Sequence, residues 1–224
     1  IATGERGEHH LLLERWASQF GRAAGARADA PYQVGWCSWY HYFERVAEEA
    51  MHANLALASE WPFDVFQLDD GYQRNVGDWL ETDETFPSGL ADLADRIAAT
   101  GMRPGIWIAP FVASHMAPIH STPGAIVRAL DGSGDPVPGS SNDHWGGVVD
   151  VLDTSNPEVL DFLASVASGL VEMGWTYLKL DFTYAPSFPG IHADPSMTPA
   201  QRVRAGYDAI RRGAGDDVFI LGCA

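Results

Sequence analysis

The chain has 224 residues, of which 46% are hydrophobic and 20% are charged. This length and composition are typical of one globular domain or a large part of one, and they exclude disordered and fibrous proteins. Thirty acidic against 14 basic residues give a formal charge of −16, which opposes nucleic acids and anionic membranes as partners. The apolar stretches also fall well short of the ~20 residues of a membrane span.

The cysteines and histidines give no support for a disulfide scaffold or a metal site. Cys37 and Cys223 lack a C-x-x-C spacing, and the eight His residues form no H-x-x-x-H pattern. We therefore expect no cofactor and no metal, and we expect a reducing compartment, the cytoplasm, because the N-terminal residues also lack a signal-peptide pattern. The chain starts on Ile1 and stops on an apolar run of strand character, so both ends are expected to be cut.

Apolar periodicity predicts an alternation of strands and helices along the chain. Residues 9–24 predict a lead-in helix, and residues 1–32 as a whole are expected to be this helix and a linker. Five short segments rich in β-branched and aromatic residues then predict buried strands, with amphipathic helices between them. The strands are expected at 33–39, 63–68, 103–109, 176–182 and 217–222, and the helices at 44–60, 89–100, 157–173 and from 198 to about 213.

The starts of the last two helices are the clearest boundaries in the sequence. Asn156 is a candidate N-cap, Pro157 suits the first helical position, and Gly174 suits the position just after the end. Thr198 followed by Pro199 repeats the same start signal.

Strand and helix alternate at ~30–40 residues, which is typical of βαβ units and a parallel sheet covered by helices. Residues 110–153 break this rhythm with a run rich in Gly, Pro, Ser and Asp, for which we expect a functional loop over the carboxyl ends of the strands. Five units fit an open doubly wound sheet or part of a closed barrel, but no nucleotide-binding glycine motif is present. Polar and aromatic strand ends favour an α/β (β/α)8 TIM barrel, of which residues 33–224 would supply the first five-eighths.

Lys179 and Asp181 lie two residues apart on one predicted strand, so both side chains point to the same side of the sheet. An ammonium beside a carboxylate keeps the acid ionised, which suits a nucleophile, although a plain buried ion pair has the same spacing. Lys179 is the only lysine, beside thirteen arginines. A compact point charge is hard to replace in a small pocket, which favours the functional interpretation.

Asp69 and Asp70 close the second predicted strand, and Gly71 indicates that the chain is already turning there. Both carboxylates can then face a pocket, where they could clamp sugar hydroxyls, share a proton or bind a cation. The alternative is an ordinary Asp-Gly turn in which one Asp caps the next element.

Five tryptophans are candidates for sugar-binding surfaces, because indole faces pack well against the C–H faces of sugars. Trp39 and Trp107 lie at strand ends and are expected in the site. Trp36, Trp79 and Trp145 are expected to be packing residues.

Six strand-end strings together resemble one known family. In order they resemble the catalytic barrel of glycoside hydrolase family 36, the melibiase-type α-galactosidases, from about residue 33 to the end, and more loosely in the preceding helix. The strings are GWCSWYHYF (35–43), FQLDDGYQ (66–73) with GDW (77–79), GIWIAPF (105–111), LDTSNPEV (152–159), YLKLDF (177–182) and ILGC (220–223).

The resemblance implies a (β/α)8 barrel and a retaining double displacement on α-galactosides such as melibiose and raffinose. Carried over by motif, Asp181 would be the nucleophile and Lys179 would bind the sugar beside it. Asp69 and Asp70 would hold the 4- and 6-hydroxyls of galactose, which is where galactose differs from glucose.

The resemblance also implies that Trp107 and Trp39 wall the galactose subsite and that Cys223 lines it, whereas the residues alone leave open whether Cys223 is a buried hydrophobe. A retaining mechanism needs a second carboxyl about 5–5.5 Å from the first, and in the family this acid/base follows the ILGC strand. The chain alone is therefore expected to be inactive. Ala224, where the family commonly has Gly, and the stretch 131–147 depart from the family pattern.

Other functions compete with hydrolysis. A galactosyl transferase of the raffinose-synthase type, or an inactive carbohydrate-binding barrel, would share the same motifs. Lys179 could instead form a Schiff base with a carbonyl substrate, but Asp181 alongside would hold its amine protonated. The expected partner is an α-galactoside oligosaccharide, and self-association of the full-length protein into a homo-oligomer is left open.

Overall fold

The computed structural model describes residues 8–26 and 30–223, in two units that divide after Gln33. Positions 27–29 of the expected linker, and Ala224, lie outside the described residues. No helix within the described part of the chain is long and apolar enough to cross a membrane.

In its described residues the first unit contains one helix, α1 (His9–Ala23), and no residue of this helix is buried. The helix expected at 9–24 is thus present. Trp16 and Phe20 lie one turn apart on it and stack with ring centroids 5.6 Å apart.

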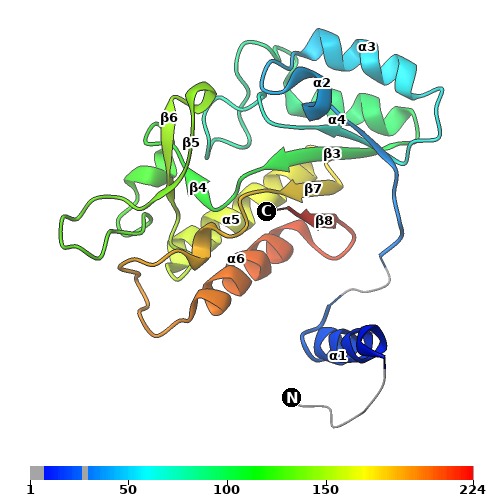
Figure 1. Ribbon diagram of the computed structural model, residues 1–224. Coiled ribbons are helices and arrows are strands. Elements are labelled where there is room, and N and C mark those ends of the chain that lie inside the picture. Colours follow the sequence, from blue (N-terminus) through cyan, green and yellow to red (C-terminus); the bar gives the residue numbers. More distant parts are fainter. Residues whose placement is uncertain (1–7, 27–29, 224) are drawn as a thin grey trace. The chain divides into compact units, whose positions relative to one another are not determined.

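The second unit is built on a five-stranded parallel sheet in the order β1-β2-β3-β7-β8. All five expected strands are confirmed, each slightly shorter than its apolar segment, and their carboxyl ends reach the same edge of the sheet (Figure 1). The strands are β1 (Gly35–Cys37), β2 (Val65–Leu68), β3 (Arg103–Ile108), β7 (Tyr177–Leu180) and β8 (Phe219–Gly222).

Helices follow the strands as expected, with α3 packed on α4 and α5 on α6. The predicted caps are present: the Asn156 side chain accepts from Glu158 N at 2.9 Å, and Thr198 forms a capping box with Gln201. The helices are α2 (Trp39–Tyr42), α3 (Glu48–Ala58), α4 (Gly89–Ala99), α5 (Pro157–Glu172) and α6 (Pro199–Ala214), with short 3₁₀ turns η1 (Pro118–Ser121), η2 (Asp143–Trp145) and η3 (Ala185–Ser187).

The helix expected over 44–60 is shorter than predicted. Ala47 is extended, so α3 begins only at Glu48, whose carboxylate accepts from Ser88 N and Ser88 Oγ, each at 2.8 Å. Contact with the start of α4 therefore decides where α3 begins, and the apolar spacing upstream of Ala47 belongs to a turn.

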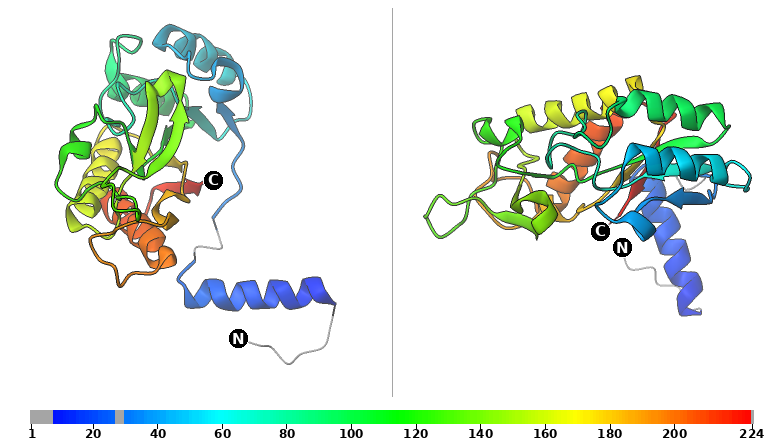
Figure 2. Two further views of the ribbon diagram at one scale, coloured as in Figure 1. Left: turned by 60° about the vertical axis from the view of Figure 1, so that its left-hand side comes forward. Right: turned by 90° about the horizontal axis from the view of Figure 1, so that it is seen from above.

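The long connection expected as a loop at 110–153 contains a small antiparallel sheet in the order β4-β6-β5. Figure 1 and the left view of Figure 2 show this sheet at the carboxyl edge of the parallel strands. The expected functional loop lies over that edge as predicted, but it contains regular strands that the sequence analysis did not predict. The strands are β4 (Val112–Ala113), β5 (Pro138–Asn142) and β6 (Gly147–Val151).

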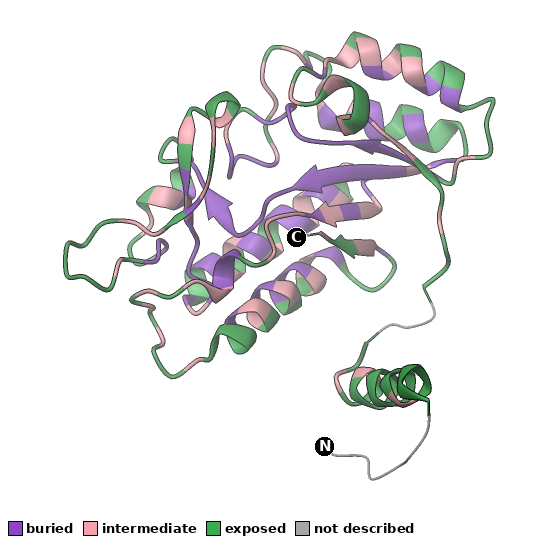
Figure 3. Ribbon diagram, in the orientation of Figure 1, coloured by how far each residue is buried: buried purple, intermediate pink, exposed green. Residues whose placement is uncertain are grey.

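The core lies between the parallel strands and their helices, and β2 and β3 are its most buried strands (Figure 3). Phe66, Leu68 and Ile106 are fully enclosed. The two edge strands differ from this centre, since β8 has half-buried and exposed residues and β1 pairs only with β2.

Gly71, in the turn after β2, occupies a position that only glycine can adopt without strain. Its φ is +116°, and an added Cβ would overlap the backbone carbonyl of Glu44. We expect Gly71→Ala to destabilise the protein by about 3 kcal/mol, because strain and overlap act together. Gly132→Ala is the matched control, since Gly132 has a φ of +81° with nothing near its Cβ. Equal losses of thermal stability in the two variants would contradict this expectation.

Candidate active site

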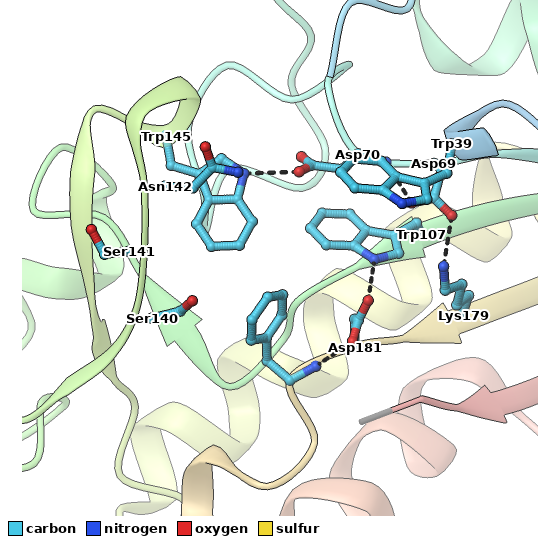
Figure 4. Close-up of a pocket in the computed structure, with 11 residues that line it drawn as sticks. Trp39, Asp69, Asp70, Trp107, Ser140, Ser141, Asn142, Trp145, Lys179 and Asp181 are labelled. Atoms are coloured by element: carbon cyan, nitrogen blue, oxygen red, sulfur yellow. Dashed lines mark hydrogen bonds and ion pairs between the residues drawn. The ribbon is translucent and has the colours of Figure 1, made fainter. Parts of the chain in front are cut away.

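A cavity of about 220 Å³ opens at the carboxyl ends of β2, β3 and β7 (Figure 4). The small antiparallel sheet forms the facing wall through β5 and η2. Its lining residues are Trp39, Asp69, Asp70, Trp107, Ser140, Ser141, Asn142, Trp145, Lys179, Asp181 and Phe182.

The turn after β2 is held rigid by its own hydrogen bonds. Asp69 N donates to Ser38 Oγ at 2.9 Å, and Asp70 N donates to Asp69 Oδ1 at 3.1 Å. Gly71 N donates to Gln73 Oε1 at 3.1 Å, and the amide of Gln73 returns a bond to Asp70 Oδ1 at 2.6 Å. Both carboxylates are thus fixed at the cavity wall, each only 2% exposed.

Asp69 is mainly engaged with other protein groups. Its Oδ2 accepts from Lys179 Nζ at 2.8 Å, from Gln67 Nε2 at 2.5 Å and from Cys37 Sγ at 3.4 Å. Burial and the Asp69 carboxylate raise the pKa of Cys37 to about 12, so its thiol stays protonated and can donate. Three donors converge on one oxygen, which leaves Oδ1 as the side of Asp69 with capacity for a ligand.

Lys179 carries the positive charge of the cavity. Burial works against its ammonium, but the Asp69 carboxylate and its hydrogen bond outweigh burial, so the pKa of Lys179 lies above its ordinary value. Its second carboxylate neighbour is Asp181, two residues along β7. The same-side placement predicted from the K-x-D spacing is present, because Lys179 and Asp181 both line the cavity.

Asp181 is the half-buried carboxylate just beyond β7. Its Oδ2 accepts from Trp107 Nε1 at 3.0 Å, a contact that Figure 4 draws as a dashed line. Its Oδ1 accepts from Phe182 N at 2.8 Å. Phe182 has a φ of +53°, a strained value for a residue other than glycine. The Cys223 thiol is also hydrogen-bonded to this carboxylate. The strained turn directs the carboxylate at the cavity, which Asp181 lines.

Asp70 is the third carboxylate that lines the cavity. Burial raises the pKa of Asp70, while hydrogen bonds from Gln73 and Trp145 act in the opposite direction. Trp145 Nε1 donates to Asp70 Oδ2 at 2.9 Å across 75 positions of sequence.

The tryptophans divide differently from the sequence prediction. Trp39 and Trp107 line the cavity as expected, Trp36 stacks on Phe66, and Trp79 lies buried edge-on to Trp107. The interpretation of Trp145 as a packing residue is incomplete, because its ring packs against the core and also reaches the site. Trp145 lines the cavity and bonds to Asp70, because η2 brings it over the carboxyl edge.

Cys223 lies beside the carboxylate of Asp181 and not among the residues that line the cavity. Burial and the Asp181 carboxylate raise the pKa of its thiol. Cys223 N donates to Leu180 O at 2.8 Å, and the Cys223 carbonyl accepts from Thr183 Oγ1 at 3.1 Å, so this residue is anchored to the turn that carries Asp181. Its side chain supports that turn from the β8 side.

The described side chains form no cluster of the kind that binds a metal ion. Within residues 8–26 and 30–223, no three His, Cys, Asp or Glu side chains are placed to hold an ion together. The charged partner of the carboxylates is Lys179.

The protein-family model described as Melibiase matches residues 34–186, which is more than half of the chain and includes every site residue so far named except Cys223. The chain belongs to the Melibiase family. This Melibiase chain is 26% identical over 215 residues to the probable α-galactosidase C of Aspergillus terreus, covering 87% of this chain and 27% of that protein. It is 34% identical over 85 residues to an α-galactosidase of Oryza sativa, covering 34% and 20%.

A solved structure agrees with the family assignment. The α-galactosidase TtGalA of Thermus thermophilus, in complex with stachyose, has a TM-score of 0.76 and 36% identity to the Melibiase chain, covering 88% of this chain and 41% of that one. The α-galactosidase AgaA of Geobacillus stearothermophilus, with a TM-score of 0.67 and 20% identity, shows the same fold. The chain spans less than half the length of these relatives.

Two kinds of residue in this Melibiase site were not predicted from the sequence. Gln67 on β2 itself and Cys37 on the neighbouring β1 hold Asp69, yet nothing in the sequence distinguishes either from an ordinary strand residue. Ser140 and Asn142 reach the cavity from a stretch that appeared to be loop. The three β-branched valines in the GVVDV run of β6 favour a strand and were a usable signal for the small sheet. Nothing local indicated which residues that sheet would bring to the cavity.

Proposed function

We propose that this chain carries the nucleophile half of the active site of a retaining α-galactosidase. One observation supports this most directly. Asp181, a carboxylate held by hydrogen bonds from Trp107 Nε1 and Phe182 N, lines the same cavity as Lys179 and Asp70. The cavity is of single-sugar size, and indole rings wall it beside a small number of charged groups, which is the usual design of a sugar-binding site.

In this proposal Asp181 attacks the anomeric carbon of a terminal α-galactoside. Its carboxylate oxygen forms the bond to carbon as the bond from that carbon to the leaving oxygen breaks, and a general acid supplies a proton to the leaving group. Water then cleaves the galactosyl ester and restores the carboxylate. Trp107 Nε1 orients the nucleophile, and Lys179 offers its remaining N–H groups to the sugar.

The general acid and base is a second carboxylic acid, which family resemblance places in a later strand-end motif, after Cys223. Asp69 is poorly suited to that task, because Lys179 and Gln67 hold it as a charged acceptor. Asp69 Oδ1 and Asp70 are proposed to accept from the 4- and 6-hydroxyls of galactose, with Trp39 on the adjoining wall.

The five parallel strands are proposed to belong to a closed (β/α)8 barrel. Two features support this. Asp69 and Lys179 project from strands separated by β3 and still meet at 2.8 Å, and the cavity lies at the carboxyl edge, where barrel enzymes place their sites.

The full-length protein tests the mechanism directly. With p-nitrophenyl α-galactoside, proton NMR of the first product formed should show α-galactose, because two displacements retain configuration. A 2-fluoro-galactosyl donor with a good leaving group should then label the peptide that contains Asp181. First release of β-galactose, or a label on a peptide lacking Asp181, would overturn the assignment, and product analysis with sucrose present would separate hydrolysis from transfer.

A further inference from the structure

The turn between β5 and β6 brings the indole N–H of Trp145 to the catalytic edge, beside the β5 residues that line the same wall. The Asn142 side chain accepts from His144 N at 3.0 Å and thereby caps η2. Gly146 and Gly147 follow with φ of +78° and +112°, so the chain turns back sharply into β6. The indole is therefore held by a rigid turn between two paired strands.

The two oxygens of Asp70 are each bound by one protein donor. Gln73 Nε2 donates to Oδ1 at 2.6 Å and Trp145 Nε1 donates to Oδ2 at 2.9 Å. A carboxylate oxygen can accept two hydrogen bonds, so each oxygen keeps one lone pair for a ligand. This distinguishes Asp70 from Asp69, whose Oδ2 already receives three donors.

We propose that Trp145 is a positioning residue that fixes Asp70 so that both of its oxygens present a lone pair to the sugar. The inference rests on the proposed function, because it assumes that Asp70 accepts from a galactose hydroxyl. The class of ligand is a pyranoside with an axial 4-hydroxyl. Trp145 thus sets how much more tightly the site binds such a sugar than one that lacks this hydroxyl.

The surroundings of Asp70 make this donor important. Burial raises the pKa of Asp70, and the donors Gln73 and Trp145, with His144 nearby, favour its charged form. Asp69 acts against the charge, and Tyr72 lies buried beside both carboxylates. Removing the indole N–H takes away one of few groups that stabilise the ionised acceptor.

The test uses Trp145→Phe in the full-length protein, which keeps an aromatic ring and removes the N–H. We expect KM for p-nitrophenyl α-galactoside to rise about tenfold, as for loss of a hydrogen bond to a charged group, with a much smaller change in kcat. With p-nitrophenyl 4-deoxy-α-galactoside, which lacks the selected hydroxyl, the same substitution should change KM less than about twofold. The acidic limb of the profile of kcat/KM against pH should move to higher pH.

Two further variants separate positioning from folding. Trp145→His keeps a ring N–H and should recover part of the lost affinity, whereas Trp61→Phe changes an exposed tryptophan and should match the parent. Equal losses on both substrates with an unmoved pH profile, or a Trp145→Phe protein that behaves like the parent, would overturn the inference. A parent protein inactive on α-galactosides would instead overturn the proposed function.

Discussion

Asp181→Ala in the full-length protein is expected to lower kcat/KM for p-nitrophenyl α-galactoside by about 10⁴-fold or more, which is the scale for loss of a group that reacts directly. The carboxylate is hydrogen-bonded by Trp107, the Phe182 amide and the Cys223 thiol, which all remain when it is removed. The substitution therefore deletes the attacking atom and leaves the cavity walls in place. KM should change much less than kcat.

The same variant allows a positive test of the role. With Asp181 shortened to Ala, azide can occupy the vacated space, attack the anomeric carbon from the nucleophile's side and release β-galactosyl azide. Rescue by azide should restore turnover for a substrate with a good leaving group, since proton donation then matters little. An Asp181→Ala protein with a tenth or more of the parent activity would exclude Asp181 as nucleophile, and so would an α-galactosyl azide product.

A matched control keeps this result specific. Asp208 is an exposed aspartate on α6 that pairs with Arg204 four residues earlier. Asp208→Ala removes the same atoms from a solvated helix surface, where an ion pair contributes little. It should retain parent activity with and without azide.

Local signals predicted most of the fold. The cap residues Asn156 and Thr198 determine where α5 and α6 begin, because their side chains satisfy backbone N–H groups of the first turn wherever the rest of the chain lies. The central strands β2 and β3 were equally predictable, since a strand buried on both faces is a largely continuous apolar run. The K-x-D spacing also placed Lys179 and Asp181 on one side of the sheet by period alone.

Features set by distant contacts could not be predicted in this way. The pairing of Trp145 with Asp70 depends on how a forty-residue excursion returns over the sheet, and no spacing between positions 70 and 145 encodes that return. The engagement of Asp69 likewise depends on Cys37 and Lys179 meeting it from β1 and β7. The sequence shows which residues follow a strand. It does not show how many hydrogen bonds each carboxylate already accepts, because those donors are brought together only when the sheet is assembled.

The second large effect is expected at the Asp69–Lys179 pair. Lys179→Met should destabilise the protein by about 3 kcal/mol, because it leaves the 2% exposed Asp69 carboxylate without its cation. Lys179→Arg should also lose activity, since a planar guanidinium cannot replace a compact ammonium among Asp69, Trp107 and Asp181. Denaturant unfolding of the full-length protein measures the first effect, and KM for the α-galactoside measures the second.

A double-mutant cycle then separates stability from sugar binding. Asp69→Asn removes the charge but keeps a side chain of the same size, so Asp69→Asn with Lys179→Met should recover most of the stability that Lys179→Met alone loses. Affinity should stay low in the double variant, because the ammonium that faces the sugar is still absent. Additive losses of stability would mean that the 2.8 Å contact carries no coupling. Recovered affinity would mean that Lys179 acts on the sugar only by holding Asp69, and would remove it from the set of sugar-binding residues.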